Sequence, residues 1–447
     1  MAPMAPMHSI APMAPTATMT PPASPPSAST TPSTPADHGG MAGMEMSGMD
    51  MGQHAGHMGH VMMNGALGGY SMTRDASGTA WQPDSEQHHG LHRQFGSWST
   101  MLHGYLTAIY DDQGGLRGAT KGFVQSHFMG TAQRPIGKDT LTFHAALSLD
   151  PLMGNSGYPL LLQTGETADG KTPLIDRQHP HNFFSELSAT YSHPLAADTN
   201  TFLYVGYPGE PALGPVTYLH RFAGMANPET PIDHHWLDST HITFGVVTAG
   251  ITKGPFKLEA SDFTGREPDQ NRWGFNPARF DSWSTRLTFN PSANLSMQVS
   301  YGDIHSPEQL TPEVNQKRIT ASVTYNRPFT HGNWETTVAW GQDNNQPGNR
   351  LNAYLLESAV QRGADTVFGR AEHAQKDELF LGNDPLNGRI FDVSKFSVGY
   401  FHTVPLTRAL ALDIGGVAGK YALPSALKPS YGSDPTSFML FIRVKFD

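Results

Sequence analysis

Residues 437–446, near the end of the chain, read SFMLFIRVKF and alternate in polarity from one residue to the next. Phe438, Leu440 and Ile442 fall on one face of an extended strand and Arg443 and Lys445 on the other, because successive side chains point to opposite faces. A strand of a soluble sandwich would show a similar alternation. The same pattern, however, recurs through the second half of the chain between short turns and longer polar segments, as a closed transmembrane barrel requires.

Short turns divide this region into pairs of strands. Segments rich in Pro, Gly, Asn or Asp, the residues that turns require, lie at 194–200, 252–255, 290–294, 327–333, 362–365 and 404–408. Longer polar segments lie at 150–182, 209–239, 264–281, 304–317, 343–351 and 374–391. The predicted strands are 98–110, 119–130, 139–149, 183–193, 201–208, 240–250, 255–263, 282–289, 294–303, 318–326, 333–342, 352–361, 364–373, 392–403, 408–420 and 437–446. Short turns that alternate with long loops are typical of outer-membrane barrels, with the turns on the periplasmic side.

The two faces of the predicted strands differ in polarity. Ile319, Val323 and Tyr325 point one way, and Thr320 and Ser322 point the other way. The polar faces also carry charges of both signs, at Glu186, Glu259, Glu335, Glu357, Lys257, Arg286, Arg443 and Lys445. A ring of this size is wide enough for an aqueous channel, and the mixed charges predict a wet or partly plugged interior. The predicted fold class is therefore all-β: an antiparallel transmembrane β-barrel of about 16 strands over residues 98–447.

Composition excludes several other classes of protein. The 447 residues include no cysteine, so disulfides, thiolate metal sites and cysteine nucleophiles are excluded. A formal net charge of -10 and the lack of any basic run argue against a nucleic-acid partner. No apolar stretch is long enough for a membrane-spanning helix, so a closed barrel is the one way in which this chain would cross a bilayer.

Residues 1–97 form a separate tail in this interpretation. Residues 1–36 consist mainly of Ala, Pro, Met, Thr and Ser, and proline at this density predicts an extended, disordered linker. Residues 40–63 then contain eight methionines and three histidines, spaced by Gly, Ala and Ser. Because hardly any other apolar residues accompany these methionines and glycine disfavours a helix, a hydrophobic core is not expected here.

Thioether and imidazole groups at this density indicate metal binding. Thioether is a soft ligand suited to Cu(I), and imidazole suits Cu(II), Zn(II) or Ni(II), so the excess of methionine favours exchangeably bound copper. The predicted ligands are Met41, Met44, Met46, Met49, Met51, His54, His57, Met58, His60, Met62 and Met63. The alternative is low-complexity drift in a disordered linker that binds no metal.

Residues 37–63 resemble the Met/His-rich tails of copper-resistance outer-membrane proteins of the B type. The resemblance is one of composition and covers this segment alone. That family joins such a tail to a C-terminal barrel and is associated with copper tolerance or efflux. The resemblance therefore implies a barrel in the outer membrane of a Gram-negative bacterium, a copper-binding tail in the periplasm, and periplasmic copper-handling proteins as partners.

Two of the long polar segments carry further candidate ligands. Residues 176–181 read DRQHPH and residues 233–241 read DHHWLDSTH, each close to the start of a predicted strand. Imidazole and carboxylate suit a divalent transition metal, and the two segments would converge if both fold into the lumen. The candidate ligands are His179, His181, Asp233, His234 and His235. The alternative is that exposed loops carry His and Asp without a metal.

The remaining motif is a charged loop. Residues 265–273 read GREPDQNRW, which predicts either a constriction inside the barrel or a structural network of salt bridges. The sequence contains no Gly-x-Ser-x-Gly elbow, P-loop or dinucleotide fingerprint, so no enzymatic activity and no catalytic or organic-cofactor residues are predicted.

Three functional hypotheses follow from the sequence. The leading one is an outer-membrane barrel that serves copper tolerance by sequestration or export, with outer-membrane lipid and copper ions as its partners. The second is a general or substrate-selective porin whose tail is incidental. The third is a barrel enzyme that uses the His-rich loops as a metal site.

Overall fold

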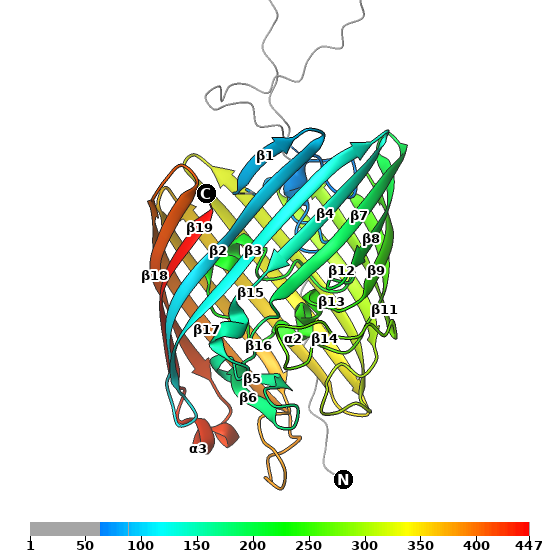
Figure 1. Ribbon diagram of the computed structural model, residues 1–447. Helices are drawn as coiled ribbons and strands as arrows, with labels where there is room; N and C mark the ends of the chain where they lie inside the picture. Colours follow the sequence, from blue (N-terminus) through cyan, green and yellow to red (C-terminus); the bar gives the residue numbers. More distant parts are fainter. Residues whose placement is uncertain (1–62, 88, 447) are drawn as a thin grey trace, which may run out of the picture. The chain divides into compact units, whose positions relative to one another are not determined.

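The computed structural model describes residues 63–87 and 89–446. Within them, one antiparallel sheet of 17 strands closes into a ring, because the last strand, β19 (Thr436–Phe446), pairs with β2 (Trp98–Gln113). The short strand β1 (Leu91–Phe95) pairs with β2 as a hairpin and stands outside the ring, which leaves sixteen strands in the wall (Figure 1). The chain is therefore a closed transmembrane β-barrel, as the alternating pattern predicts.

Every predicted strand overlaps one strand of the wall. The other wall strands are β3 (Thr120–Ile136), β4 (Asp139–Leu147), β7 (Phe184–Ala196), β8 (Thr199–Gly206), β9 (Val246–Lys253), β10 (Phe256–Phe263), β11 (Ser282–Ser292), β12 (Leu295–Ile304), β13 (Asn315–Phe329), β14 (Gly332–Gln346), β15 (Arg350–Arg362), β16 (Asp365–Lys376), β17 (Phe391–Pro405) and β18 (Leu410–Ala422). One prediction misses its start: β9 begins at Val246 rather than at residue 240, because residues 239–241 form a 3-10 helix inside the barrel.

The connections between strands differ in length at the two ends of the barrel. At one end, called here the short-turn end, hairpins such as β9–β10 and β15–β16 close over only a few residues. At the other, the long-loop end, residues 148–183 and 207–245 join consecutive wall strands. Because the number of strands is even, β2 begins and β19 finishes at the short-turn end.

The wall has an apolar outer surface and a polar inner one. On β13, Val323 is exposed on the outside, whereas Thr320 is fully buried on the inside. On β19, Leu440 and Ile442 are exposed and Met439 is buried. Ladder hydrogen bonds around the closed ring satisfy the backbone, and the outward side chains supply the apolar surface that lipid requires.

Three segments of the chain pack inside the ring. The first is residues 63–87, called here the inner segment, which includes η1 (Met72–Arg74). The second is residues 148–183, with η2 (Asp150–Met153) and a hairpin of β5 (Tyr158–Thr167) and β6 (Pro173–Gln178). The third is residues 207–245, with α1 (Phe222–Ala226), α2 (His234–Leu237) and η3 (Ser239–His241); Figure 1 shows β5, β6 and α2 within the outline of the barrel.

Two short helices, η4 (Ser425–Leu427) and α3 (Lys428–Tyr431), lie in the last loop. None of the helices in residues 63–87 and 89–446 is long and apolar enough to cross a bilayer.

Buried charges fasten these segments to the wall. Arg221, from residues 207–245, places its Nε atom 2.5 Å from Oε1 of Glu357 on β15. Lys257 on β10 donates to the backbone oxygen of Thr79 in the inner segment and lies 2.9 Å from Glu259. Glu357 and Lys257 are thus paired with inserted segments, whereas Arg443 and Lys445 lie near Asp413 of the wall. Residues 63–87, which the sequence analysis includes in the tail of residues 1–97, pack inside the barrel.

Candidate functional site

The two loops that carry the predicted histidines both enter the lumen. His179 and His181 follow β6, where Pro180 holds the backbone extended and ends the hairpin. His234 and His235 lie on α2, in the second loop. One turn of this helix brings the Nδ1 atom of His234 to 2.6 Å from Oδ1 of Asp238. The site is thus built from loops that the barrel wall holds in place.

The histidine rings of the two loops form one cluster. The ring of His241 lies 5.2 Å from that of His181 and 5.2 Å from that of His234, measured between centroids. His179 and His235 are 5.9 Å apart by the same measure. The structure therefore brings together the four predicted histidines and His241, which belongs to the same predicted motif of residues 233–241.

Burial keeps most of these rings neutral. It lowers the pKa of His179 to about 3, with further lowering from His181 and His234. Burial likewise holds the pKa values of His235 and His241 well below the ordinary range. The Nε2 atoms of His235 and His241 have no hydrogen-bond partner within the described part of the chain. A neutral imidazole with a free ring nitrogen is the form that binds metal ions.

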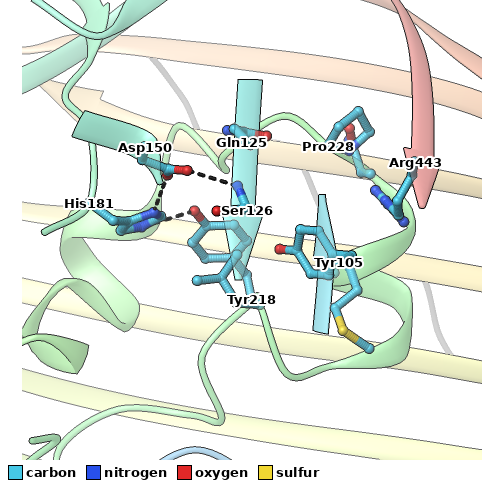
Figure 2. Close-up of a pocket in the computed structure, with 12 residues that line it drawn as sticks. Tyr105, Gln125, Ser126, Asp150, His181, Tyr218, Pro228 and Arg443 are labelled. Carbon is cyan, nitrogen blue, oxygen red and sulfur yellow. Dashed lines mark hydrogen bonds and ion pairs between the residues drawn. The ribbon is translucent and has the colours of Figure 1, made fainter. Parts of the chain in front are cut away.

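His181 and Asp150 form a second, fully hydrogen-bonded unit (Figure 2). The Nδ1 atom of His181 lies 2.8 Å from Oδ2 of Asp150, whose other oxygen accepts from the backbone N–H of Ser126 at 2.9 Å. The Nε2 atom of His181 lies 3.4 Å from the hydroxyl of Tyr218. These residues line a cavity of about 10 Å³, which is room for about one water molecule. His181 therefore has partners at both ring nitrogens, unlike His235.

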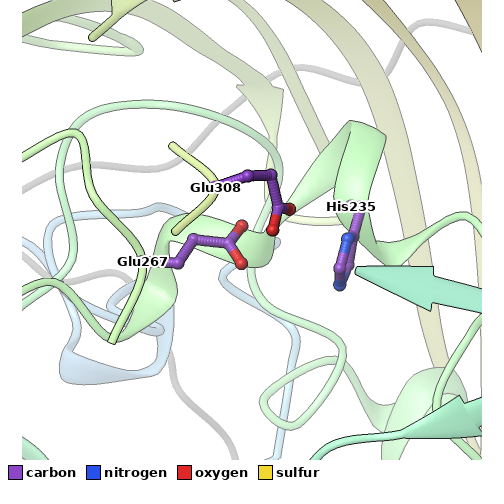
Figure 3. Close-up of side chains that lie close together, drawn as sticks. All are labelled: His235, Glu267 and Glu308. Atoms are coloured by element: carbon purple, nitrogen blue, oxygen red, sulfur yellow. The ribbon is translucent and has the colours of Figure 1, made fainter. Parts of the chain in front are cut away.

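The best-formed ligand set combines His235 with two glutamates that the sequence analysis did not select. One ligand atom each from His235, Glu267 and Glu308 lies within 4.8 Å of the others (Figure 3). Glu267 lies in the charged loop 265–273, and Glu308 lies in the loop after β12. Imidazole and carboxylate oxygens are ligands of divalent transition metals. Of these two glutamates, only Glu267 lies in a motif that the sequence analysis noted, the charged loop 265–273. That motif gave no indication that Glu308 or His235 would lie beside it.

Electrostatics also favour a cation between these three side chains. Burial raises the pKa of Glu267 to about 7. Burial and then the charge of Glu267 raise the pKa of Glu308 to about 8. Two carboxyl groups that are hard to ionise side by side gain stability when a cation binds between them, because the cation favours the ionised forms.

A close backbone approach positions the His235 ring. Gly165 on β5 has a φ of +106°, and a Cβ atom there would lie 2.2 Å from the Cε1 atom of His235. Only glycine leaves room for the imidazole at this point.

Asp233 has a different environment from the one predicted. It is fully buried, and neither of its carboxylate oxygens has a hydrogen-bond partner within residues 63–87 and 89–446. Burial, followed by the charge of Glu372, raises its pKa well above the ordinary range. Asp233 is not one of the side chains whose ligand atoms meet at His235, Glu267 and Glu308.

Most of the predicted ligands in the tail lie outside the described residues; these are Met41, Met44, Met46, Met49, Met51, His54, His57, Met58, His60 and Met62. Met63 is described and is only 4% exposed. It packs against Met72 of the inner segment and Met101 of β2.

No protein family model matches the sequence, and no curated protein matches it significantly. Among solved structures, the chain is similar to the anion-selective porin from Comamonas acidovorans, with 12% identity, a TM-score of 0.47, and coverage of 78% of this chain and 100% of that one. It is also similar to Salmonella typhi OmpF in complex with daunomycin, with 9% identity, a TM-score of 0.48, and coverage of 80% and 100%. The outer membrane channel DcaP of Acinetobacter baumannii shows 11% identity, a TM-score of 0.46, and coverage of 80% and 100%.

Proposed function

We propose that this barrel lies in the outer membrane of a Gram-negative bacterium and binds copper ions, serving copper tolerance by sequestration or export. Residues 1–62 act as a periplasmic copper-binding tail that exchanges the metal with periplasmic copper-handling proteins. Support comes from the thioether and imidazole groups of residues 40–63, which match the preferences of Cu(I) and Cu(II).

The observation that carries the proposal is the meeting of neutral imidazoles and carboxyl groups in the lumen. His235, Glu267 and Glu308 come from three different loops and lie within reach of one ion, and the Nε2 atom of His235 has no hydrogen-bond partner in the described part of the chain. A barrel with ligands both in its tail and in its lumen suits the capture of a metal ion better than the free passage of solutes. No catalysed reaction is part of this proposal.

Purified protein provides the first test. We expect the full chain to bind Cu(II) in detergent, and we expect His235→Asn to bind about one ion fewer per chain. His305→Asn is the matched control, because His305 is exposed in the loop that also carries Glu308. Copper content would be measured by mass spectrometry of the metal after desalting. Equal copper content in all three proteins would remove the lumen site.

Cells provide the second test. Strains that produce the full chain, a chain without residues 37–62, or no chain would be compared for growth in copper and for cell-associated copper. We expect tolerance to fall from the first strain to the last at equal amounts of protein in the outer membrane. Identical growth and copper content in the three strains would contradict the proposed role.

The size of the ring favours a substrate-selective porin as the second candidate. Sixteen strands enclose enough space for an aqueous channel. Conductance across planar bilayers separates the two candidates. Steady ion conductance that copper does not alter, together with unchanged copper tolerance in cells, would favour the porin.

A further inference from the structure

A second set of metal-binding groups lies at the short-turn end of the lumen. A cavity of about 370 Å³ is bounded by the inner segment, by β2 and β3, by α1, and by the turn at residues 363–364. Its lining includes five methionines and five histidines: Met63, Met72, Met101, Met129, Met225, His89, His103, His127, His144 and His220. Eight methionines lie in the described residues, and five of them meet at this one cavity.

The register of the wall places these groups next to one another. His103 on β2 is paired directly with Met129 on β3, and Tyr105 is paired with His127. Met101 and His103 are two residues apart on the inner face of β2, as are His127 and Met129 on β3. Side chains that face each other across two strands have Cβ atoms about 5 Å apart, which is within reach of a shared ion.

The methionines form a cluster of their own rather than part of a mixed core. Met63, Met72 and Met101 pack together, and no leucine, isoleucine or aromatic residue belongs to this cluster of buried residues. Methionine commonly fills irregular gaps in a hydrophobic core, but there it accompanies aliphatic and aromatic side chains. The three methionines therefore offer soft sulfur ligands, because few other apolar side chains pack against them.

Imidazole rings adjoin the same cavity. The His220 ring lies 5.0 Å from that of His127 and 6.3 Å from that of His103. His127 is only 6% exposed, and its Nε2 atom has no hydrogen-bond partner in the described part of the chain. Buried polar nitrogens nearly always have a partner, so this nitrogen, on a residue that lines the cavity, is available to a ligand held there.

We propose that this cavity binds Cu(I), with its ligands drawn from the thioethers of Met63, Met72, Met101 and Met129 and the imidazole of His127. Soft thioether sulfur selects Cu(I) over harder divalent ions, and a neutral imidazole completes a low-coordinate site. The inference rests on the proposed role in copper handling and adds a specific site to it. Met63 also follows directly after the Met/His-rich sequence of residues 40–62, so ligands of the tail and of the cavity are neighbours along the chain.

The cavity adjoins a smaller one that is lined by His181 of the histidine cluster. It shares four lining residues, Tyr105, Leu219, Met225 and Arg443, with the smaller cavity that contains His181. From His181, ring contacts lead through His241 and His234 towards the ligand set at His235. Shared cavity lining and neighbouring imidazole rings therefore lie between the proposed Cu(I) site and the ligand set at His235.

Silver provides the test, since Ag(I) is a soft monovalent ion that does not change oxidation state in air. Full chain in detergent would be titrated with Ag(I) against a competing thioether, and the bound ions counted by native mass spectrometry. We expect Met101→Leu/Met129→Leu to bind one Ag(I) fewer per chain. Both changes conserve side-chain volume, so the fold should tolerate them.

The matched control is Met153→Leu/Met297→Leu, which changes two methionines that do not line the cavity. This control should bind as many ions as the unaltered chain, and ions on the tail contribute equally to all three proteins. The folded state of each variant is checked by its altered gel migration before and after heating. Equal ion counts for a folded Met101→Leu/Met129→Leu variant and the unaltered chain would overturn the proposed site.

The outcome is distinguishable from a failure of the proposed function. If cells grow equally in copper with and without the protein while the ion count still falls by one, the site exists and the role in tolerance is wrong. If tolerance depends on the protein but the ion count is unchanged, the role stands and the cavity site is wrong.

Discussion

Replacing Arg221 with methionine should release residues 207–245 from the barrel wall. The Arg221 side chain is 2% exposed, and it pairs with Glu357 at 2.5 Å and with Asp238 at 3.3 Å. Removal of one partner from a buried ion pair costs about 3–5 kcal/mol, because it leaves an uncompensated charge.

The remaining contacts set the size of the effect at the lower end of that range. After Arg221→Met, Glu357 still lies 3.3 Å from Arg370, and Asp238 still lies 2.6 Å from His234. We therefore expect a loss of about 3 kcal/mol in the local stability of this loop. At about 1.4 kcal/mol for each factor of ten, the loop should open about 150-fold more often.

Hydrogen exchange measures this opening directly. The backbone N–H of Met225 donates to the oxygen of Arg221 at 2.8 Å within α1, and its exchange reports on loop opening. The matched control is Lys428→Met, because the pair of Lys428 with Asp434 is about two-fifths exposed and should contribute little. Exchange at α1 that changes no more in Arg221→Met than in the control would refute the view that this ion pair holds the loop.

Two further predictions concern the outer wall and the lumen site. Leu440→Arg changes an exposed position midway along β19. If the residue faces the bilayer centre, this change should lower the stability of the folded barrel by about 2–4 kcal/mol. The loss would be measured as a lower yield of folding into lipid vesicles, and an unchanged yield would contradict a lipid-facing wall. Gly165→Ala should reduce Cu(II) binding as much as His235→Asn does, because a Cβ atom at residue 165 meets the His235 ring. A copper content equal to that of the unaltered chain would show that copper binding does not depend on the position of this ring.

The wall of the barrel could be predicted because its pattern is local. The strand predicted at residues 437–446 is β19, Thr436–Phe446, and its alternating side chains face lipid and lumen in turn. Each wall strand has one apolar and one polar face, so the alternation of neighbouring residues is enough to predict the strand and the direction in which its side chains point.

The contents of the lumen could not be predicted in the same way. All ten residues of β5 are buried, so Tyr158–Thr167 shows no alternation that would mark it as a strand. His241 falls both in the predicted motif of residues 233–241 and in the predicted strand 240–250, and it lies in η3. Glu267 and Glu308 come from different loops, and no spacing in the sequence relates either one to His235. These positions depend on which loop fills which part of the ring, which is decided by contacts between distant residues.

The pairing of β19 with β2 has a consequence for biosynthesis. β2 precedes the other wall strands in the sequence and β19 follows them, so a nascent chain has two unpaired sheet edges until β19 has been made. A frameshift or proteolytic cut that removed β19 would leave both edges open, and a bilayer offers no water to satisfy them. Quality control thus has a simple criterion, because only a polypeptide that includes β19 can finish insertion.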